Sequence, residues 1–329
     1  MSTIGAMLQT AAGGPEVLQR GKVNLEPPAA GEVRLRHTAI GVNFHDVYHR
    51  SGLYPIEAFP VVPGIEGAGV VTETGAGVTV LQPGDRVAYG SPPMGAYALE
   101  RNFPADRLAK IPDSVPDEVA GCSMIRGMTA FILLHRVVRI EAGTTVIIHA
   151  AAGGAGQILC QWAHHLGAEV IGTAGSLEKA EIARQCGCDH AIVYGEENFV
   201  DRVRQITAGR GVQVVYDSVG ADTFIGSLDC LAPLGTLVCF GQASGMPPAI
   251  TIRDLQARGS LTLTRPMLPD YTRDHADYVE AAQAWFKALE EGVVKVEVAH
   301  RYRLSEAARA HADLEGRRTR GPVVMIPEG

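Results

Sequence analysis

Two patterns of apolar residues divide the chain near residue 127. Before this point, short β-type segments are separated by Gly and Pro, as in Gln82-Pro83-Gly84-Asp85, which is typical of a compact and mostly antiparallel β domain. The predicted strands are Val33–His37, Gly69–Glu73, Asp85–Tyr89 and Ala96–Leu99. The last predicted strand, Val323–Pro327, has the same β character, so we expect it to return to this first domain.

After residue 127, apolar runs alternate with segments of helical periodicity. The predicted strands are Thr145–Ala150, Glu169–Thr173, Ala191–Tyr194, Val212–Asp217 and Thr236–Gly241. The predicted helices end near Leu166, span Ser176–Cys186 and Phe199–Thr207, and follow Ala221, and a loop at Gln242–Pro248 precedes a long helix at Asp274–Glu291. Repeated strand–helix–strand units make right-handed crossovers, so an α/β fold with a doubly wound parallel sheet is predicted. We place one domain at 1–126 with 267–329 and the other at 127–266.

Composition and charge exclude several classes of protein. The chain has 29 Lys and Arg against 36 Asp and Glu, which gives a net charge of −7. Dedicated nucleic-acid-binding proteins are basic, so this class is not favoured. The chain has neither a basic, apolar leader nor an uninterrupted membrane-length apolar run, so we expect a soluble, unexported protein without a membrane partner. The 6 cysteines include no CxxC pair, which favours reduced thiols in a cytoplasmic protein. The 38 glycines indicate a backbone with many tight turns or close approaches to a ligand.

A glycine-rich loop joins the first strand of the second domain to its helix. It reads Ala151-Ala152-Gly153-Gly154-Ala155-Gly156, a G-x-G-x-x-G fingerprint with Ala151 in place of the first glycine. Gly153 lets the backbone approach a pyrophosphate, and Gly156 lets the helix pack on the strand. The N-terminus of the helix supplies free N–H groups and a positive dipole end. Between a strand and a helix, this loop predicts nucleotide binding.

The end of the second strand indicates which nicotinamide cofactor is bound. An NAD enzyme has Asp or Glu there, whereas this chain has Gly175 and Ser176, with Lys179 one turn into the next helix. A lysine and a hydroxyl suit a 2′-phosphate, so NADPH is predicted as the cofactor. Glu178 is the competing detail, because it would favour NAD if it turned inward. Lys179 also has a plainer interpretation, as a solvated helix residue.

The sequence resembles the zinc-independent quinone oxidoreductases of the medium-chain dehydrogenase/reductase superfamily, the group that includes zeta-crystallin. The motifs that carry the resemblance are Gly41–Asp46, Arg50–Pro55, Pro63–Gly69, Gly84–Val87, His149–Gly156, Val215–Gly220 and Phe240-Gly241. The resemblance implies a GroES-like β domain built from both chain ends, a Rossmann domain between them, and a homodimer formed across the Rossmann domains. It also implies cofactor contacts at Asn43, Tyr54, Gly153, Gly154, Ala155, Gly175, Lys179, Tyr194, Phe240 and Ser244, with Gly175, Lys179 and Tyr194 around the 2′-phosphate. The full candidate set adds Thr129, Ala152, Gly156, Ser176, Ser218, Gly241 and Arg317. The family's usual Val in the glycine loop is Ala155 here.

Zinc alcohol dehydrogenases of the same superfamily are the main rival class. They carry a Cys ligand where this chain has Asn43 and a His ligand where it has Ile65, and neither replacement suits zinc. Glu66 and Asp46 remain, and we expect them to be buried hydrogen-bond partners of Arg or backbone. No metal site is therefore predicted. Without a Lewis acid, the expected substrates are quinones and conjugated enones, which accept hydride readily.

Three residues are candidate catalytic groups. Asn43 is a candidate donor to the oxyanion that develops on the acceptor, or to a cofactor hydroxyl, and Tyr54 is a candidate proton donor or cleft residue. Thr129, expected at the start of the linking helix, is placed to reach the nicotinamide. Each has a structural alternative: a loop amide, a half-buried aromatic residue and a helix N-terminal residue. His45 and His49 are further candidates for protonating the product.

Two other functions stay open at this point. A reductase of 2-enoyl thioesters shares the fold and the hydride chemistry. A non-enzymatic NADPH-binding or RNA-binding role of the zeta-crystallin kind would use the basic clusters Arg301–Arg303 and Glu315–Arg320, which also have a plainer interpretation as a solvated helix end with one Arg near the cofactor. The acidic net charge argues against nucleic acid as a partner.

Overall fold

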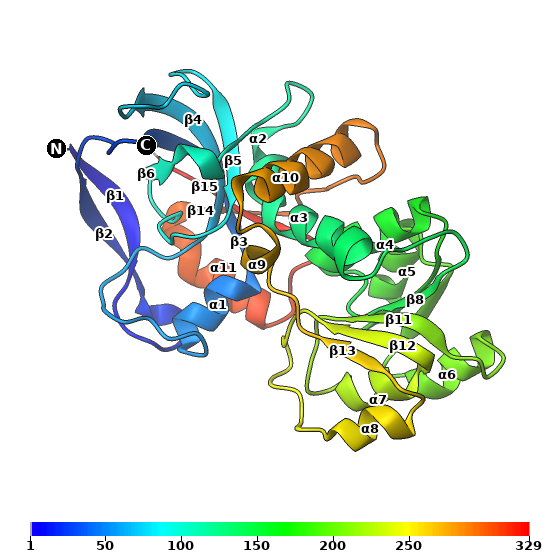
Figure 1. Cartoon of the computed structure of the whole chain (residues 1–329). Coiled ribbons are helices and arrows are strands. Elements are labelled where there is room, and N and C mark those ends of the chain that lie inside the picture. Colours follow the sequence, from blue (N-terminus) through cyan, green and yellow to red (C-terminus); the bar gives the residue numbers. More distant parts are fainter. Residues whose placement is uncertain (1, 329) are drawn as a thin grey trace. The chain divides into compact units, whose positions relative to one another are not determined.

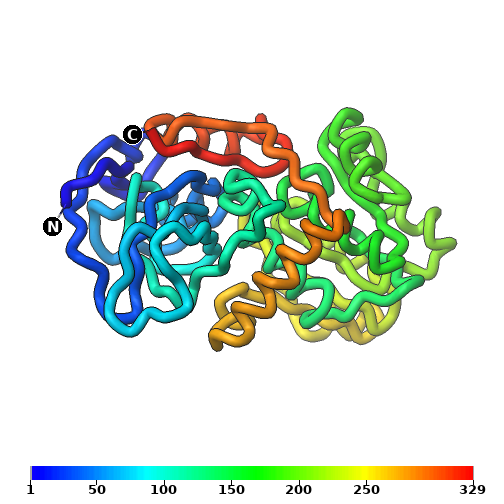
Figure 2. The backbone as a smooth tube through the Cα atoms, turned by 90° about the horizontal axis from the view of Figure 1, so that it is seen from above, coloured from blue at the N-terminus to red at the C-terminus, as the bar shows by residue number. Residues whose placement is uncertain are grey.

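The computed structural model describes residues 2–328 and divides into two compact units (Figure 1). Unit 1 consists of Met1–Met128, Thr272–Glu290 and Val296–Gly329, and unit 2 consists of Thr129–Tyr271 and Glu291–Lys295. The strands nearest the two chain ends, β1 and β15, both lie in unit 1 (Figure 2). The domain boundaries predicted from the sequence, after residues 126 and 266, remain a proposal and are not the same as the boundaries of these two units. No helix among the described residues is long and apolar enough to cross a membrane.

Unit 2 is built on a parallel sheet. Its strands are β8 (Thr145–Ile148), β9 (Glu169–Ala174), β10 (His190–Val193), β11 (Val212–Asp217), β12 (Leu231–Cys239) and β13 (Thr262–Thr264), in the order β10-β9-β8-β11-β12-β13. Every neighbouring pair is parallel. Central residues such as Ile147, Val215 and Leu237 are fully buried, which is why these strands read as continuous apolar runs. The predicted doubly wound fold is confirmed.

Helices cover the two faces of this sheet. They are α4 (Gly154–His165), α5 (Leu177–Gln185), α6 (Phe199–Ile206), α7 (Phe224–Asp229) and α8 (Ile252–Ala257), with the short α9 (Leu268–Tyr271) beyond them. Figure 1 shows α4 and α5 on the side of the sheet opposite α7 and α8. The strand order reverses between β8 and β11, so the loops that follow these two strands diverge at the carboxyl edge. Ligands of open α/β sheets bind at such a switch point.

Unit 1 is a β-rich unit. Among the described residues its larger sheet has the order β14-β15-β3-β4-β5-β7, with β6 paired to β3, and β1 and β2 form a separate antiparallel pair. The strands are β1 (Ser2–Gln9), β2 (Leu18–Leu25), β3 (Glu32–Val42), β4 (Glu66–Thr74), β5 (Arg86–Gly90), β6 (Glu100–Pro104), β7 (Ala109–Lys110), β14 (His300–Arg303) and β15 (Val323–Ile326). β15 pairs antiparallel with β3, which confirms that the last strand returns to the first domain.

Helices and turns complete unit 1 and link it along the chain to unit 2. The helices are α1 (Phe44–Ser51), α2 (Asp117–Gly121), α10 (His275–Glu290) and α11 (Ala307–Glu315), with 3₁₀ turns η1 (Pro15–Val17), η2 (Ala105–Arg107) and η4 (Leu304–Glu306). Helix α3 (Met124–Ile132) continues from unit 1 into unit 2 and is followed by a π-helical turn, η3 (Leu133–Val137). In α3, a Cβ on Gly127 would lie 1.9 Å from the ring of Trp285, so only glycine fits there.

Two predicted strands differ from the structure. Ala96–Leu99 is not a regular strand, because the N–H groups of Ala96 and Tyr97 donate to the carbonyls of Gly64 and Pro63 at 3.0 Å each. Only an isolated bridge joins Ala98 to Ala6. Strand β12 begins at Leu231 rather than Thr236, because its pairing with β11 continues across a register shift. Apolar patterning does not reveal either feature, since both depend on which partner strand or loop is available.

Candidate functional site

The glycine loop leads from β8 into α4. The N–H of Ala151 donates to the Thr173 carbonyl at 2.9 Å, which fixes the loop to β9. A Cβ on Gly156 would lie 2.3 Å from the Ala150 oxygen and 2.8 Å from Ala151 Cα, so the helix packs here only with glycine. At Gly153 the nearest atom to such a Cβ, again the Ala150 oxygen, is 3.1 Å away.

The N-terminus of α4 has the features of an anion site. Gly153 is its N-cap, in an extended conformation and without a side-chain cap. The first N–H groups of a helix have no partner within the helix, and its dipole adds positive charge there. Gly153, Gly154 and Ala155 are partly exposed, whereas Ala152 and Gly156 are buried. These residues therefore fit a pyrophosphate, the group that the sequence predicts at this loop.

Four predicted residues of the 2′-phosphate site lie at the adjoining ends of β9 and β10. Val193 pairs with Ala174, and the N–H of Tyr194 donates to the Ala174 carbonyl at 3.1 Å. Ser176 is the N-cap of α5, and its hydroxyl accepts from the Lys179 N–H at 3.3 Å. A Cβ on Gly175 would meet nothing within 4 Å. Lys179 is partly buried and Glu178 exposed. The structure therefore brings Gly175, Ser176, Lys179 and Tyr194 to one edge of the sheet, with open space beside Gly175.

The loops after β11 and β12 pack against each other at the same carboxyl edge. The hydroxyl of Ser244 donates to the Val219 carbonyl at 2.9 Å, and the N–H of Ala243 donates to the Ser218 carbonyl at 3.2 Å. A Cβ on Gly241 would lie 2.6 Å from the Ser218 oxygen. The predicted residues Ser218, Phe240, Gly241 and Ser244 are thus collected in one partly buried cluster of loops.

A buried polar network, which no pattern in the sequence predicts, joins the strand ends of unit 2. His149 Nδ1 lies 2.7 Å from the Tyr194 hydroxyl and 2.9 Å from the Thr173 hydroxyl. His149 Nε2 lies 2.9 Å from the hydroxyl of Ser227, which donates to Asp217 at 2.9 Å. His149, Thr173, Asp217 and Ser227 are all 0% exposed. His149 and Asp217 lie within motifs that carry the family resemblance, but sequence alone gave no sign that they meet.

In unit 1, Asn43 lies within a buried cluster of charges. It caps α1, and its side-chain amide donates to Glu66 Oε2 at 2.8 Å. Asp46 accepts the Asn43 N–H at 2.8 Å, and Glu66 accepts the Ile125 N–H at 2.7 Å and lies 3.8 Å from the Arg126 guanidinium. The expectation that Asp46 and Glu66 are buried hydrogen-bond partners is confirmed. Burial raises the pKa of Asp46 to about 7, and burial also raises the pKa of Glu66 against the opposing effect of Arg126.

Tyr54 lies in an aromatic cluster beside α1. Its ring centroid is 5.4 Å from that of His45 and 5.5 Å from that of His49, both edge-on. Burial, with a smaller contribution from His49, lowers the pKa of His45 to about 4, and burial lowers the pKa of His49. Both imidazoles are therefore neutral at neutral pH, and a neutral imidazole is a weak proton donor.

Thr129 and Arg317 complete the predicted set. Thr129 lies in the middle of α3 rather than at its start, because the helix already begins at Met124. The prediction of a helix N-terminal position was wrong. Arg317 is exposed, follows the C-cap residue Gly316 of α11 and has a φ of 57°. Asn43, Tyr54 and Arg317 belong to unit 1, whereas Thr129 and the other candidates belong to unit 2.

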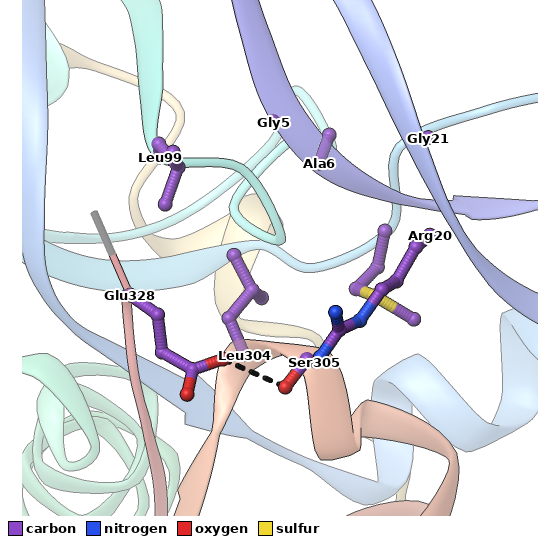
Figure 3. Close-up of a pocket in the computed structure, with 9 residues that line it drawn as sticks. Gly5, Ala6, Arg20, Gly21, Leu99, Leu304, Ser305 and Glu328 are labelled. Atoms are coloured by element: carbon purple, nitrogen blue, oxygen red, sulfur yellow. Dashed lines mark hydrogen bonds between the residues drawn. The ribbon is translucent and has the colours of Figure 1, made fainter.

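Unit 1 also contains a groove of about 290 Å³ that the sequence did not suggest (Figure 3). Residues of β1 and β2 line it together with Leu99, Ser305 and Glu328. The Ser305 hydroxyl donates to Glu328 Oε2 at 2.7 Å. None of the predicted site residues lines this groove, so it is separate from the proposed chemistry. Among residues 2–328, no group of three or more His, Cys, Asp or Glu side chains is arranged to hold a metal ion.

The fold and its glycine loop define a dinucleotide-binding oxidoreductase, and comparisons with known proteins place it within that class. Residues 29–113 match the alcohol dehydrogenase GroES-like domain, and residues 154–285 match the zinc-binding dehydrogenase family. The chain is 47% identical to a 2-haloacrylate reductase of a Burkholderia species, over 96% of this chain and 97% of that protein. It is 45% identical to a quinone oxidoreductase of Salmonella typhimurium, with 96% and 97% covered.

A solved structure gives the same relationship. The Escherichia coli quinone oxidoreductase complexed with NADPH superposes with a TM-score of 0.96 at 42% identity, covering 98% of this chain and 100% of that one. The chain belongs to the quinone oxidoreductase family of the medium-chain dehydrogenase/reductase superfamily. The predicted family, the GroES-like and Rossmann fold class and the assignment as an enzyme are thereby confirmed.

Proposed function

We propose that this protein transfers hydride from NADPH to quinones or similar conjugated carbonyl acceptors. The observation that carries the proposal is the end of β9, where Gly175, Ser176 and Lys179 replace the acidic residue that would bind an NAD ribose. A relative of 42% identity was crystallised with NADPH, which supports the same cofactor here. The N–H groups at the start of α4 would hold the pyrophosphate. Ser176 and Lys179 would hold the 2′-phosphate.

When bound, the nicotinamide supplies a hydride from its C4, and negative charge then builds on the acceptor oxygen. Tyr54 is proposed as a donor to that oxygen or as a wall of the acceptor site, and Thr129 as a contact to the nicotinamide. Asn43 already donates one amide hydrogen to Glu66, so its second hydrogen is the one proposed for the acceptor or a cofactor hydroxyl. The proposal is zinc-independent, because Asn43 and Ile65 provide neither thiolate nor imidazole.

A second acceptor class is favoured by a specific comparison. The 47% identical relative is named for reducing 2-haloacrylate, an alkene conjugated to a carboxylate. Conjugated enones and 2-enoyl thioesters have the same electron-poor C=C bond. The RNA-binding alternative has less support, because Arg301 pairs with Glu118 and Arg318 with Asp313, each at 2.7 Å. All cysteines are free thiols, which supports the proposed cytoplasmic location.

We expect the purified protein to oxidise NADPH in the presence of quinones, followed at the nicotinamide absorbance. The panel includes 2-haloacrylate, a simple enone and a 2-enoyl thioester. In Lys179→Ala, we expect the KM for NADPH to rise about 10- to 100-fold, because a charge-assisted hydrogen bond is lost, while the KM for NADH stays within about twofold. Arg184→Ala, on the exposed side of α5, is the matched control. Failure of every acceptor would refute the reductase, and equal losses for both cofactors would refute the 2′-phosphate assignment.

We also propose a homodimer that forms through the edge of the unit 2 sheet. β13 ends the strand order, so one side of its backbone has no strand partner among the described residues. Leu263 on β13 is 36% exposed, and Ile252 on α8 is 87% exposed. An apolar edge strand readily pairs with a second copy of itself. We expect sedimentation of the unaltered protein to give the mass of two chains. The Leu263→Lys variant should contain a greater proportion of single chains. A single-chain mass for the unaltered protein would contradict the proposal.

A further inference from the structure

We propose that His149 is a positioning residue for cofactor selectivity: its Nδ1 accepts the Tyr194 hydroxyl and holds that side chain at the 2′-phosphate site. The inference rests on the proposed function, because it concerns how this chain prefers NADPH to NADH. His149 directly follows β8, Thr173 lies on β9 and Tyr194 directly follows β10. The contact therefore spans the three neighbouring strand ends that border the proposed cofactor site.

The hydrogen-bond partners determine which nitrogen of His149 carries the proton. The hydroxyl of Ser227 lies 2.9 Å from an Asp217 carboxylate oxygen and 2.9 Å from the Thr223 carbonyl. Both of these groups only accept, so the Ser227 hydrogen is used by one of them. The Ser227 oxygen must then accept from His149 Nε2. In a neutral imidazole the other nitrogen, Nδ1, is an acceptor.

This tautomer determines the direction of the hydrogen bonds that the Tyr194 and Thr173 hydroxyls make. Nδ1 has one lone pair, and the Tyr194 hydroxyl, at 2.7 Å, is its nearer donor. The Thr173 hydroxyl lies 2.5 Å from the Tyr194 oxygen and donates to it. The Tyr194 and Ser227 hydroxyls thus each donate one hydrogen bond and accept another, and the Thr173 hydroxyl donates to Tyr194. Burial lowers the pKa of His149, although the Asp217 charge opposes this shift, so the imidazole stays neutral as the scheme requires.

This network fixes the position of the tyrosine as well as its proton. The rings of His149 and Tyr194 are nearly parallel, at 15° with centroids 6.0 Å apart, and Phe199 packs edge-on against both. The tyrosine hydroxyl is held by His149, and Tyr194 follows the end of β10 that pairs with the end of β9 before Gly175. Asp217 extends the network to the loop after β11, because it accepts the Val219 and Gly220 N–H groups at 2.8 and 3.0 Å.

Two substitutions at His149 separate this role from general packing. The Oδ1 of His149→Asn takes the place of Nδ1 and still accepts from Tyr194, whereas His149→Gln reaches Ser227 but loses that acceptor. We expect His149→Gln to raise the KM for NADPH about 5- to 10-fold, with the KM for NADH and kcat changed less than about twofold. We expect His149→Asn to keep most of the preference for NADPH. Thermal unfolding identifies the temperature range in which both variants are folded, and kinetics are compared there.

Tyr194→Phe and Lys179→Ala complete the test. If His149 acts through the tyrosine hydroxyl, Tyr194→Phe reproduces the effect of His149→Gln, and the double variant is no worse than either single variant. Equal effects of His149→Asn and His149→Gln, or equal losses for NADPH and NADH, would overturn the inference. Lys179→Ala tests the phosphate site itself. If it abolishes the preference while His149→Gln leaves the preference unchanged, only the inference fails; if it leaves the preference intact, the proposed site fails.

Discussion

Replacing Gly156 with Ala is expected to reduce NADPH affinity by about 100-fold or more and to destabilise unit 2. The added Cβ would lie 2.3 Å from the Ala150 carbonyl oxygen and 2.8 Å from Ala151 Cα, and both are backbone atoms that cannot rotate away. Helix α4 must move away from β8, which displaces the N–H groups proposed for the pyrophosphate. In catalytic sites a misplacement of about 1 Å costs roughly 100-fold in rate, and we expect a loss of similar size in affinity here. Overpacking a tight core costs about 1–3 kcal/mol in addition.

Isothermal titration with NADPH and a urea unfolding curve measure the two effects of this substitution. Gly175→Ala is the matched control for stability, because a Cβ there meets nothing within 4 Å. It should unfold at the same urea concentration as the unaltered protein. Normal NADPH affinity in a folded Gly156→Ala variant would show that the start of α4 does not hold the pyrophosphate.

Replacing Arg126 with Met is expected to lower the free energy of unfolding by about 3–5 kcal/mol at neutral pH, because it leaves a buried carboxylate without its cation. Glu66 is 0% exposed, and the guanidinium 3.8 Å away is the nearby charge that opposes the effect of burial on its pKa. Arg126 also donates to the carbonyls of Cys122 and Val42, so two further acceptors lose a partner.

The pH dependence of the stability lost in Arg126→Met shows whether the buried charge of Glu66 causes the loss. Burial raises the pKa of Glu66 in the folded state. At pH values between the pKa of Glu66 in the unfolded state and its pKa in the folded state, the native protein binds more protons than the unfolded protein. The free energy of unfolding therefore falls as pH rises through this range. Without the arginine, that pKa rises further, and the loss should be smaller at pH 5 than at pH 8. Adding Glu66→Gln should recover part of the stability at pH 8, since a neutral amide then replaces the buried carboxylate beside the missing arginine. A loss that is the same at both pH values, with no recovery, would assign the effect to the lost carbonyl contacts instead.

Much of unit 2 was predictable from the sequence. Its strands are buried on both faces, so they read as apolar runs, and the helices between them follow a helical period. The glycine loop and the acid-free end of β9 were also predictable, because local backbone chemistry needs particular residues at particular spacings. The elements of unit 1 were harder to predict from the sequence. Ala96–Leu99 has the alternation of a strand, but its N–H groups are taken by Pro63 and Gly64, far away in the sequence.

By itself, the sequence determined the class of fold, the family, the glycine loop and the residues that favour a 2′-phosphate. All of these depend on local periodicity or on motifs within a few residues. Only the tertiary structure decided which polar side chains share protons. His149 meets Thr173, Tyr194 and Ser227 across 24, 45 and 78 residues of sequence, and Asn43 meets Glu66 across 23. Such pairs form because burial deprives polar atoms of water, and each must then find a partner wherever the fold brings one near.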